Sequence, residues 1–210
     1  MKTLVHPTYF PNIITFATLM QHDIIWEIQD NYQKQTFRNR CYIANDRGRH
    51  LLNIPIQHVG NSQGRQKYKN VKLENVYAWQ RQHWRTLQTA YRTSPFFEYY
   101  EDELAPLYEK KHTYLLEFNL KTIETVYGCL QLTPPIARTT IYLPDVTDLN
   151  DARALVNAKT SFDFEQPEYT QVFGDRHGFI ANSSILDLLF NEGPNSVEYL
   201  KNITLPEIYA

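Results

Sequence analysis

The sequence predicts an α/β protein, with an N-terminal β-α-β unit and an antiparallel hairpin in a mixed sheet, followed by a mainly helical middle and C-terminal part. Apolar runs at 2–6 and 24–28 flank a segment with helical spacing at 13–21. Two β-rich runs at 37–44 and 49–56 enclose the turn sequence Asn45-Asp46-Arg47-Gly48. From Trp79 onward the apolar residues recur mostly at helical spacing. Alternating strands and helices at the start and helices afterwards favour this fold class.

The chain is long enough for one domain. Its 210 residues are 42% hydrophobic and 21% charged, which is typical of a globular protein. We expect a single domain over 1–210, with a sheet-rich basic part at 1–76 and a mainly helical acidic part at 77–210. No apolar run approaches the length of a membrane span, and the first residues lack a signal-peptide core. Two cysteines cannot form a disulfide framework, so we expect a cytoplasmic protein.

The N-terminal unit predicts a ligand-binding position. Asn12 is a suitable cap for a helix that begins at Ile13, and a right-handed crossover through this helix makes the two flanking strands parallel. The joint at 6–11, which begins with His6, then lies at the carboxyl ends of the strands. Open α/β sheets bind their ligands at this edge.

The hairpin can be assigned a register. Pairing Ala44 with Arg49 places Tyr42 opposite Leu51 and Cys41 opposite Leu52. One face is then apolar, with Cys41, Ile43, Leu52 and Ile54. The other face is cationic and polar, with Arg38, Arg40, Tyr42, Leu51 and Asn53, and Lys34 extends it if the strand begins early. Asn39 is expected on the core side. A shift of one residue would invert both faces.

The residues after the hairpin are predicted to form a loop, a short strand and five helices. We expect a loop at 58–69, a short strand at 71–76, and helices at 79–92, 95–108, 112–128, 151–158 and 183–191. Ser183 is the predicted cap of the last helix, and Gly193 follows its end.

Charge is distributed unevenly along the chain. The total is −2, but residues 31–92 carry twelve basic and two acidic side chains, and residues 93–210 carry eight basic and eighteen acidic ones. In one interpretation, the basic segment packs against the acidic part and the charges offset locally. In the other, part of the basic segment lines a cleft for a phosphate or carboxylate. Nucleic acid is not the expected partner, since the pI is about 6.4.

Standard catalytic motifs are absent from the sequence. It contains no phosphate-binding loop, no Gly-x-Gly-x-x-Gly and no Gly-x-Ser-x-Gly. No two histidines have the spacing of a zinc protease, so no metal site is predicted. No cofactor is identified by the sequence.

Several motifs together resemble the WbqC-like family. His6-Pro7-x-Tyr9-Phe10-Pro11 is similar to that family's opening Gln-Pro-x-Tyr-Phe-Pro. The Asn-Arg strand at 37–40, its partner at 52–56, the motifs at 79–97 and the segments at 169–171 and 184–193 follow in the family's order. The resemblance spans nearly the whole chain. It implies a largely uncharacterised family with members in surface-polysaccharide (O-antigen) gene sets, and a glycine transferase role has been suggested for one member. His6 replaces the usual Gln, although imidazole also donates and accepts hydrogen bonds.

Candidate site residues follow from position, chemistry and this resemblance. His6 and His83 are the candidate catalytic groups, because a histidine titrates near neutral pH; each could instead be a histidine satisfied inside the fold. Arg38 and Arg40 are candidates to hold anionic oxygens, or to pair with carboxylates. The other candidate substrate-binding residues are Tyr9, Asn53, Trp79, Arg85, Tyr169, Gln171 and Asp187.

Three functional hypotheses remain open. The first is a transferase of polysaccharide biosynthesis that moves an aminoacyl (glycyl) group from or to a phosphate-bearing small molecule. The second is a non-catalytic anion-binding or assembly module, which the absence of catalytic motifs favours. The third is a nucleotidylyltransferase-like nucleotide-binding protein, because the joint between strand, His-Pro and helix is similar to the phosphate-contacting region of that class.

Overall fold

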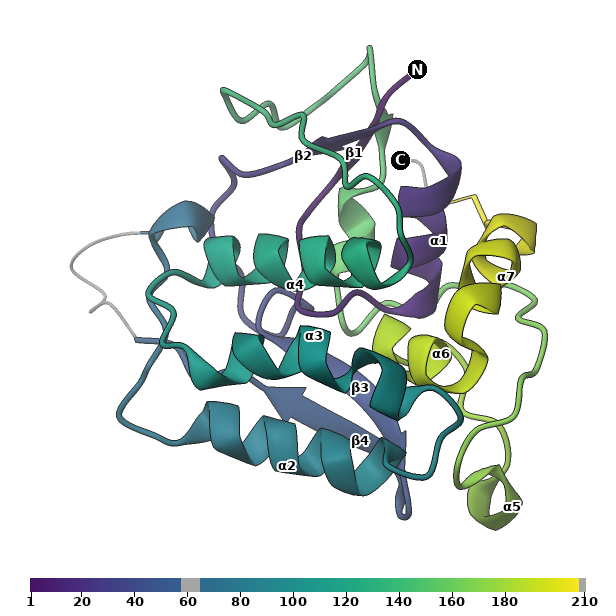
Figure 1. The fold of residues 1–210 in the computed structure, drawn as a ribbon. Coiled ribbons are helices and arrows are strands. Elements are labelled where there is room, and N and C mark those ends of the chain that lie inside the picture. Colours follow the sequence, from purple (N-terminus) through teal and green to yellow (C-terminus); the bar gives the residue numbers. More distant parts are fainter. Residues whose placement is uncertain (58–64, 208–210) are drawn as a thin grey trace.

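A computed structural model describes residues 1–57 and 65–207 and has the expected α/β class (Figure 1). β1 (Thr3–Val5) lies at the centre of a three-stranded sheet, parallel to β2 (Ile24–Trp26) and to β5 (Asn150–Asp151). Helix α1 (Ile13–Gln21) makes the crossover. The Asn12 side chain accepts a hydrogen bond from the backbone N–H of Thr15 (3.2 Å), which confirms the predicted cap.

The hairpin has the predicted register. β3 (Arg40–Asn45) and β4 (Gly48–Asn53) are antiparallel, with Ala44 opposite Arg49 and Cys41 opposite Leu52. All four residues of the predicted apolar face are buried. Asn39 is also buried and donates to the Ile54 carbonyl. One detail differs from the prediction, because the hairpin forms its own two-stranded sheet instead of joining a mixed one.

Three long helices form the middle of the chain, as predicted. They are α2 (Trp79–Tyr91), α3 (Phe97–Glu109) and α4 (Leu115–Cys129). α3 lies between α2 and α4, and the hairpin lies beside α2 (Figure 1). A short 3-10 turn, η2 (Tyr68–Asn70), precedes them. The predicted loop at 58–69 lies partly outside the described residues.

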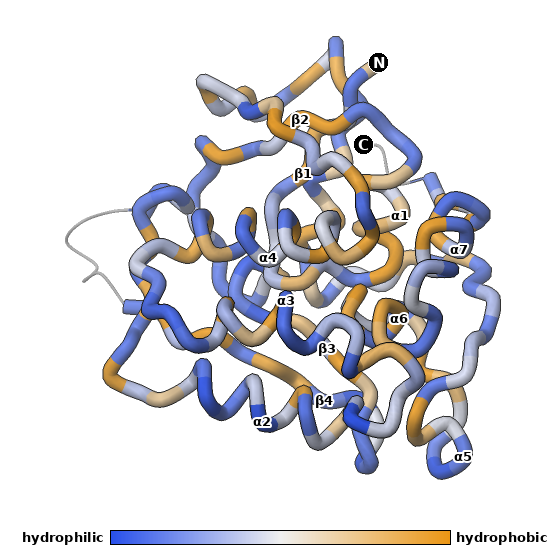
Figure 2. The backbone as a smooth tube through the Cα atoms, viewed as in Figure 1, coloured by the Kyte–Doolittle hydropathy of each residue, from blue (hydrophilic) through white to orange (hydrophobic). Residues whose placement is uncertain are grey.

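The C-terminal part contains short elements. They are η3 (Arg153–Val156), α5 (Gly174–His177), α6 (Ile185–Glu192), η4 (Gly193–Asn195) and α7 (Ser196–Asn202). α6 is buried against α1, α3 and β3. The apolar side chains of the two sheets and the longer helices form one core cluster, and Figure 2 shows hydrophobic stretches in both sheets and in the helices between them.

Three local predictions were wrong. Residues 71–76 form only isolated bridges, Leu73 with Ile56 and Lys72 with Tyr114, because the segment is shared between two neighbours and Pro55 has no N–H to extend a ladder. Residues 151–158 are divided between β5 and η3, since the start of this segment pairs with β1. The cap of α6 is Ser184 rather than Ser183; its Oγ accepts from the Leu186 N–H.

Candidate functional site

A buried charged cluster lies at the carboxyl end of β1. His6 directly follows this strand, Asp30 follows β2, and Arg38 precedes β3. Arg38 is completely buried, and its Nη2 donates to Asp30 Oδ2 (2.8 Å) and to His6 Nε2 (3.0 Å). Parallel strands that end at one edge bring His6 and Asp30 together. The cationic row predicted for the hairpin surface is therefore broken, because the Arg38 guanidinium turns into the interior.

His6 is neutral in this cluster. Its Nδ1 donates to the Glu27 carbonyl (3.3 Å), so Nε2 carries the lone pair that accepts from Arg38, a side chain without acceptors. Burial, followed by the positive charge of Arg38, holds the pKa of His6 well below its usual value. In this geometry His6 holds the guanidinium in place.

The Arg38 guanidinium is only partly satisfied. Its Nε and Nη1 atoms are buried without a hydrogen-bond partner among the described residues. The Tyr68 ring lies 5.2 Å from the guanidinium carbon, and Asn119 donates to the Arg38 carbonyl at 2.6 Å. Thr8 Oγ1 and Asn119 Oδ1 are also buried without a partner in the described part of the chain. Unpaired donors on a buried cation are energetically unfavourable unless a further acceptor binds there.

Arg40 and Asn53 lie at a different place. They line the hairpin pocket, a cavity of about 600 Å³ between residues 32–40, 53–57, Glu74 and Tyr77. Lys34 adds a second cation to its wall. Arg40 Nε is buried without a partner among the described residues, and Asn53 Oδ1 accepts from Asn39 (3.2 Å). Tyr32 also lines this pocket; burial raises its pKa, and the positive charges of Arg40 and Arg38 oppose the shift.

Tyr9, His83 and Trp79 form an enclosed aromatic group. The Tyr9 hydroxyl bonds to His83 Nδ1 (3.0 Å) and to the Tyr108 hydroxyl (2.9 Å), and Tyr9 is fully buried. Burial lowers the pKa of His83 to about 4, although a hydrogen bond to the Asn53 backbone opposes this shift. The Trp79 ring meets the His83 ring edge-on, with centroids 5.2 Å apart. In this structure His83 is thus a neutral histidine with partners inside the fold.

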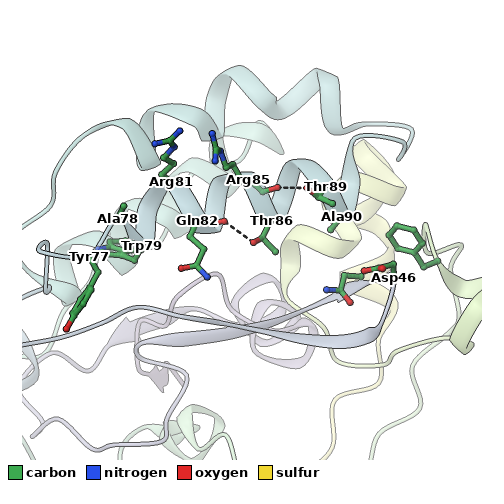
Figure 3. A pocket seen from close by; sticks show the side chains of 12 residues that line it. Asp46, Tyr77, Ala78, Trp79, Arg81, Gln82, Arg85, Thr86, Thr89 and Ala90 are labelled. Carbon is green, nitrogen blue, oxygen red and sulfur yellow. Dashed lines mark hydrogen bonds between the residues drawn. The ribbon is translucent and has the colours of Figure 1, made fainter.

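Arg85 lies on another surface, in the α2 pocket. This cavity of about 890 Å³ is lined by α2, the residues preceding it, the hairpin tip and Phe173. Figure 3 shows Arg81 and Arg85 one turn apart, on the opposite side of α2 from Gln82 and Thr86. The structure does not bring Arg85 together with Arg38 or His6.

Asp187, Tyr169 and Gln171 were predicted together as substrate-binding residues, and the structure places their side chains in contact. Asp187 is fully buried and accepts from the Tyr169 hydroxyl (2.6 Å), the Gln171 amide (2.7 Å) and the Tyr91 hydroxyl (2.6 Å). Burial raises the pKa of Asp187, and these hydrogen bonds oppose the shift. All three partners donate, so the acceptor is the carboxylate.

Sequence reasoning missed several partners of these groups. They are Asp30, Tyr68, Tyr91, Tyr108 and Asn119. Asp30 carried a signal that could have found it, because an acidic residue shortly after β2 reaches the same sheet edge as His6. Tyr91 belongs to the motifs at 79–97 and was expected as core or pocket wall, whereas Tyr68, in the predicted loop, and Tyr108 and Asn119, in predicted helices, carried no distinguishing signal.

The described residues contain no group of three or more His, Cys, Asp or Glu side chains placed to hold a metal ion. None of the helices in the described ranges combines the length and apolar character needed to cross a bilayer. Cys41 is buried, and burial raises the pKa of its thiol, which agrees with the expected core-facing position.

Comparisons with known proteins give one family and one relative. Residues 6–160 match the family model described as the WbqC-like protein family. An uncharacterized protein of Mycobacterium tuberculosis, Rv1507c, is 27% identical over 199 residues, which cover 81% of this chain and 84% of that protein. No solved structure matches the chain.

Proposed function

Because the chain belongs to the WbqC-like protein family, we propose that it is a transferase acting on an anionic, phosphate-bearing small molecule in the biosynthesis of an O-antigen-type surface polysaccharide. The group transferred, from or to that substrate, is an aminoacyl group such as glycyl. The pathway and the group rest on the family resemblance. The anionic character of the substrate rests on the site.

One observation supports an anionic substrate. Arg38 is completely buried, yet Nε and Nη1 find no hydrogen-bond partner among the described residues. A single carboxylate, Asp30, holds only Nη2. An oxyanion at Nη1 or Nε would gain a charge-assisted hydrogen bond without displacing Asp30 or His6. Arg40 and Lys34, which line the hairpin pocket, add positive charge within four residues of Arg38 in the chain.

His6 and His83 have different roles in this proposal. His6 acts through Arg38, whose orientation it fixes, so it is a positioning residue in this conformation. His83 acts as a proton acceptor only if the Tyr9 hydroxyl releases its Nδ1. Tyr9 and Trp79 then form the wall behind His83.

Calorimetry with inorganic phosphate and pyrophosphate tests the anion site. We expect the double variant Arg38→Met/Asp30→Asn, which removes both buried charges together, to weaken binding tenfold or more, corresponding to about 1.5–3 kcal/mol. Arg38→Lys, which keeps the charge but loses the guanidinium geometry, provides a second test. Arg92→Met removes an exposed cation at the end of α2 and is the matched control. Affinity for both anions that stays unchanged in the Arg38 variants contradicts the proposal.

A second candidate is an anion-binding module without catalysis. The observation that favours it is that His6 and His83 are both neutral and have partners within the fold. A thermal-shift screen of phosphate-bearing metabolites, followed by mass spectrometry of the bound compound, separates the two candidates. Conversion of the compound, abolished by Arg38→Lys, supports the transferase. Binding without conversion supports the module.

A further inference from the structure

A third cavity, the C-terminal pocket, has none of His6, Asp30 and Arg38 in its lining, and it includes Tyr169 and Gln171 of the Asp187 group. Its volume is about 700 Å³, and it lies between the segment at 167–179, the end of α6 and α7. Three aromatic residues (Tyr169, Phe179 and Tyr199) and three acidic residues (Glu168, Asp175 and Glu192) line it. It shares no lining residue with the hairpin pocket or the α2 pocket. All its lining residues follow residue 160, where the family match ends.

The Tyr169 ring packs edge-to-face with each of the other two rings. Tyr169 meets Phe179 at an interplanar angle of 83°, with centroids 5.1 Å apart, and meets Tyr199 at 90°, with centroids 5.4 Å apart. All three residues also line the cavity, so ring surface outside these edge contacts faces it. The Tyr199 hydroxyl is bonded to the Pro167 carbonyl, so this ring is held in place. The face of an aromatic ring is negative and attracts cations.

The electrostatic character of the C-terminal pocket is one-sided. Among the described residues that line it, three are carboxylates and none is Lys, Arg or His. Asp187 adds a fourth negative charge behind the wall, through its bonds to Tyr169 and Gln171. Burial, with the charges of Glu192 and Asp187, raises the pKa of Tyr199 to about 12, although the nearby Gln166 side chain opposes the shift. An anion would be repelled from this cavity, and a positive charge would be stabilised.

We propose that the C-terminal pocket is a binding site for a small molecule that carries an organic ammonium group, enclosed by Tyr169, Phe179 and Tyr199 and balanced by Glu168, Asp175 and Glu192. The combination of rings and carboxylates selects this class of ligand. A strongly hydrated inorganic cation gains little from apolar ring faces, and a neutral apolar molecule gains nothing from the carboxylates. The inference is independent of the anion site, because it concerns other residues and a ligand of opposite charge.

Choline and its neutral isostere 3,3-dimethylbutan-1-ol test the proposal on the full chain. The two probes have nearly the same shape and differ by the positive charge. Titrations followed by amide chemical shifts report both affinity and location. We expect choline to bind in the millimolar range, with shifts at 167–179 and 192–199, about tenfold tighter than the alcohol.

Two variants and two controls make the test specific. Glu192→Gln should weaken choline binding about threefold and leave the alcohol unaffected, because it removes charge without volume. Tyr199→Leu should weaken choline binding about tenfold. Glu117→Gln on α4 and Tyr99→Leu on α3, both exposed and outside the pocket, should change neither. Equal affinity for the two probes, no choline binding in the millimolar range, or shifts located elsewhere would overturn the proposal.

Discussion

Removing Arg38 alone should destabilise the protein much more than removing Arg38 and Asp30 together. The Arg38 side chain is 0% exposed, the Asp30 side chain is 9% exposed, and their charged atoms are 2.8 Å apart. Arg38→Met leaves a buried carboxylate without its cation, and breaking such a pair lowers the free energy of unfolding by about 3–5 kcal/mol. Adding Asp30→Asn removes the stranded charge and keeps the oxygen that accepts from Asn31. The double variant should therefore recover most of this loss.

Urea unfolding at neutral pH measures the effect as a double-mutant cycle. The wild type, both single variants and the double variant give the coupling energy of the pair. The surface pair Lys121–Glu124 is the matched control, since its side chains are 59% and 46% exposed. The cycle Lys121→Met and Glu124→Gln should give a coupling energy below about 0.5 kcal/mol.

The buried pair is not coupled if the Arg38 and Asp30 effects simply add, or if Arg38→Met is no more destabilising than Lys121→Met. Either result would mean that water or a side-chain rearrangement satisfies Asp30 without Arg38. A large coupling energy also has a consequence for function. It makes the double variant, and not a single alanine, the correct protein in which to measure the loss of anion binding.

Three other changes test other parts of the fold. The pKa of His83 is lowered from 6.5 to about 4, so the folded protein holds this histidine neutral where the unfolded chain would protonate it. The free energy of unfolding of the wild type should therefore fall by up to about 3 kcal/mol from this group as the pH decreases from 6.5 to 4. In urea unfolding, His83→Gln should flatten that decline. Gly193→Ala should lower the free energy of unfolding by about 2 kcal/mol, because φ is +54° and a Cβ would lie 2.5 Å from the Phe96 ring. Gly128→Ala is the control: its Cβ would meet nothing within 4 Å, so in the same assay it should be neutral or stabilising. Asp187→Asn should lower the thermal midpoint and destabilise by about 2–3 kcal/mol, since an amide nitrogen would face hydroxyl or amide donors; an unchanged midpoint would contradict the assignment of a carboxylate.

The sequence predicted correctly those elements whose conformation depends on residues close to them in the chain. The hairpin register followed from alternation around Asn45-Asp46-Arg47-Gly48, and α1 followed from Asn12 and apolar spacing. The segments at 71–76 and 151–158 were different. Their backbone partners lie far away in sequence, at Ile56 and Tyr114 for the first and in β1 for the second. Tertiary pairing overrides local preference in such short segments.

The same distinction applies to the candidate site: single residues were recognised from the sequence, but their long-range contacts were not. The sequence identified which residues carry chemistry, but alternation alone could not place Arg38, because it lies before β3 begins and its direction is set by Asp30 and His6. Asp187 was recognised, yet its partner Tyr91 lies on α2, with no sequence relation to α6. Contacts between distant elements decide which candidates converge, and one sequence does not contain them.

The uneven charge of the chain is not removed by pairing. The described ion pairs join Arg38 to Asp30, Arg153 to Asp151, and Lys121 to Glu124, while the neutral His6 ring also lies against Asp30. None of these joins the basic segment at 31–92 to the acidic part at 93–210, so the first interpretation of the charge pattern finds no support among the described residues. Unpaired surface charge acts as a field over about 8–10 Å at physiological ionic strength. The lining of the hairpin pocket carries Lys34 and Arg40 against Glu74, and that of the C-terminal pocket carries three carboxylates, which is the polarity required by an anionic ligand at one and an ammonium ligand at the other.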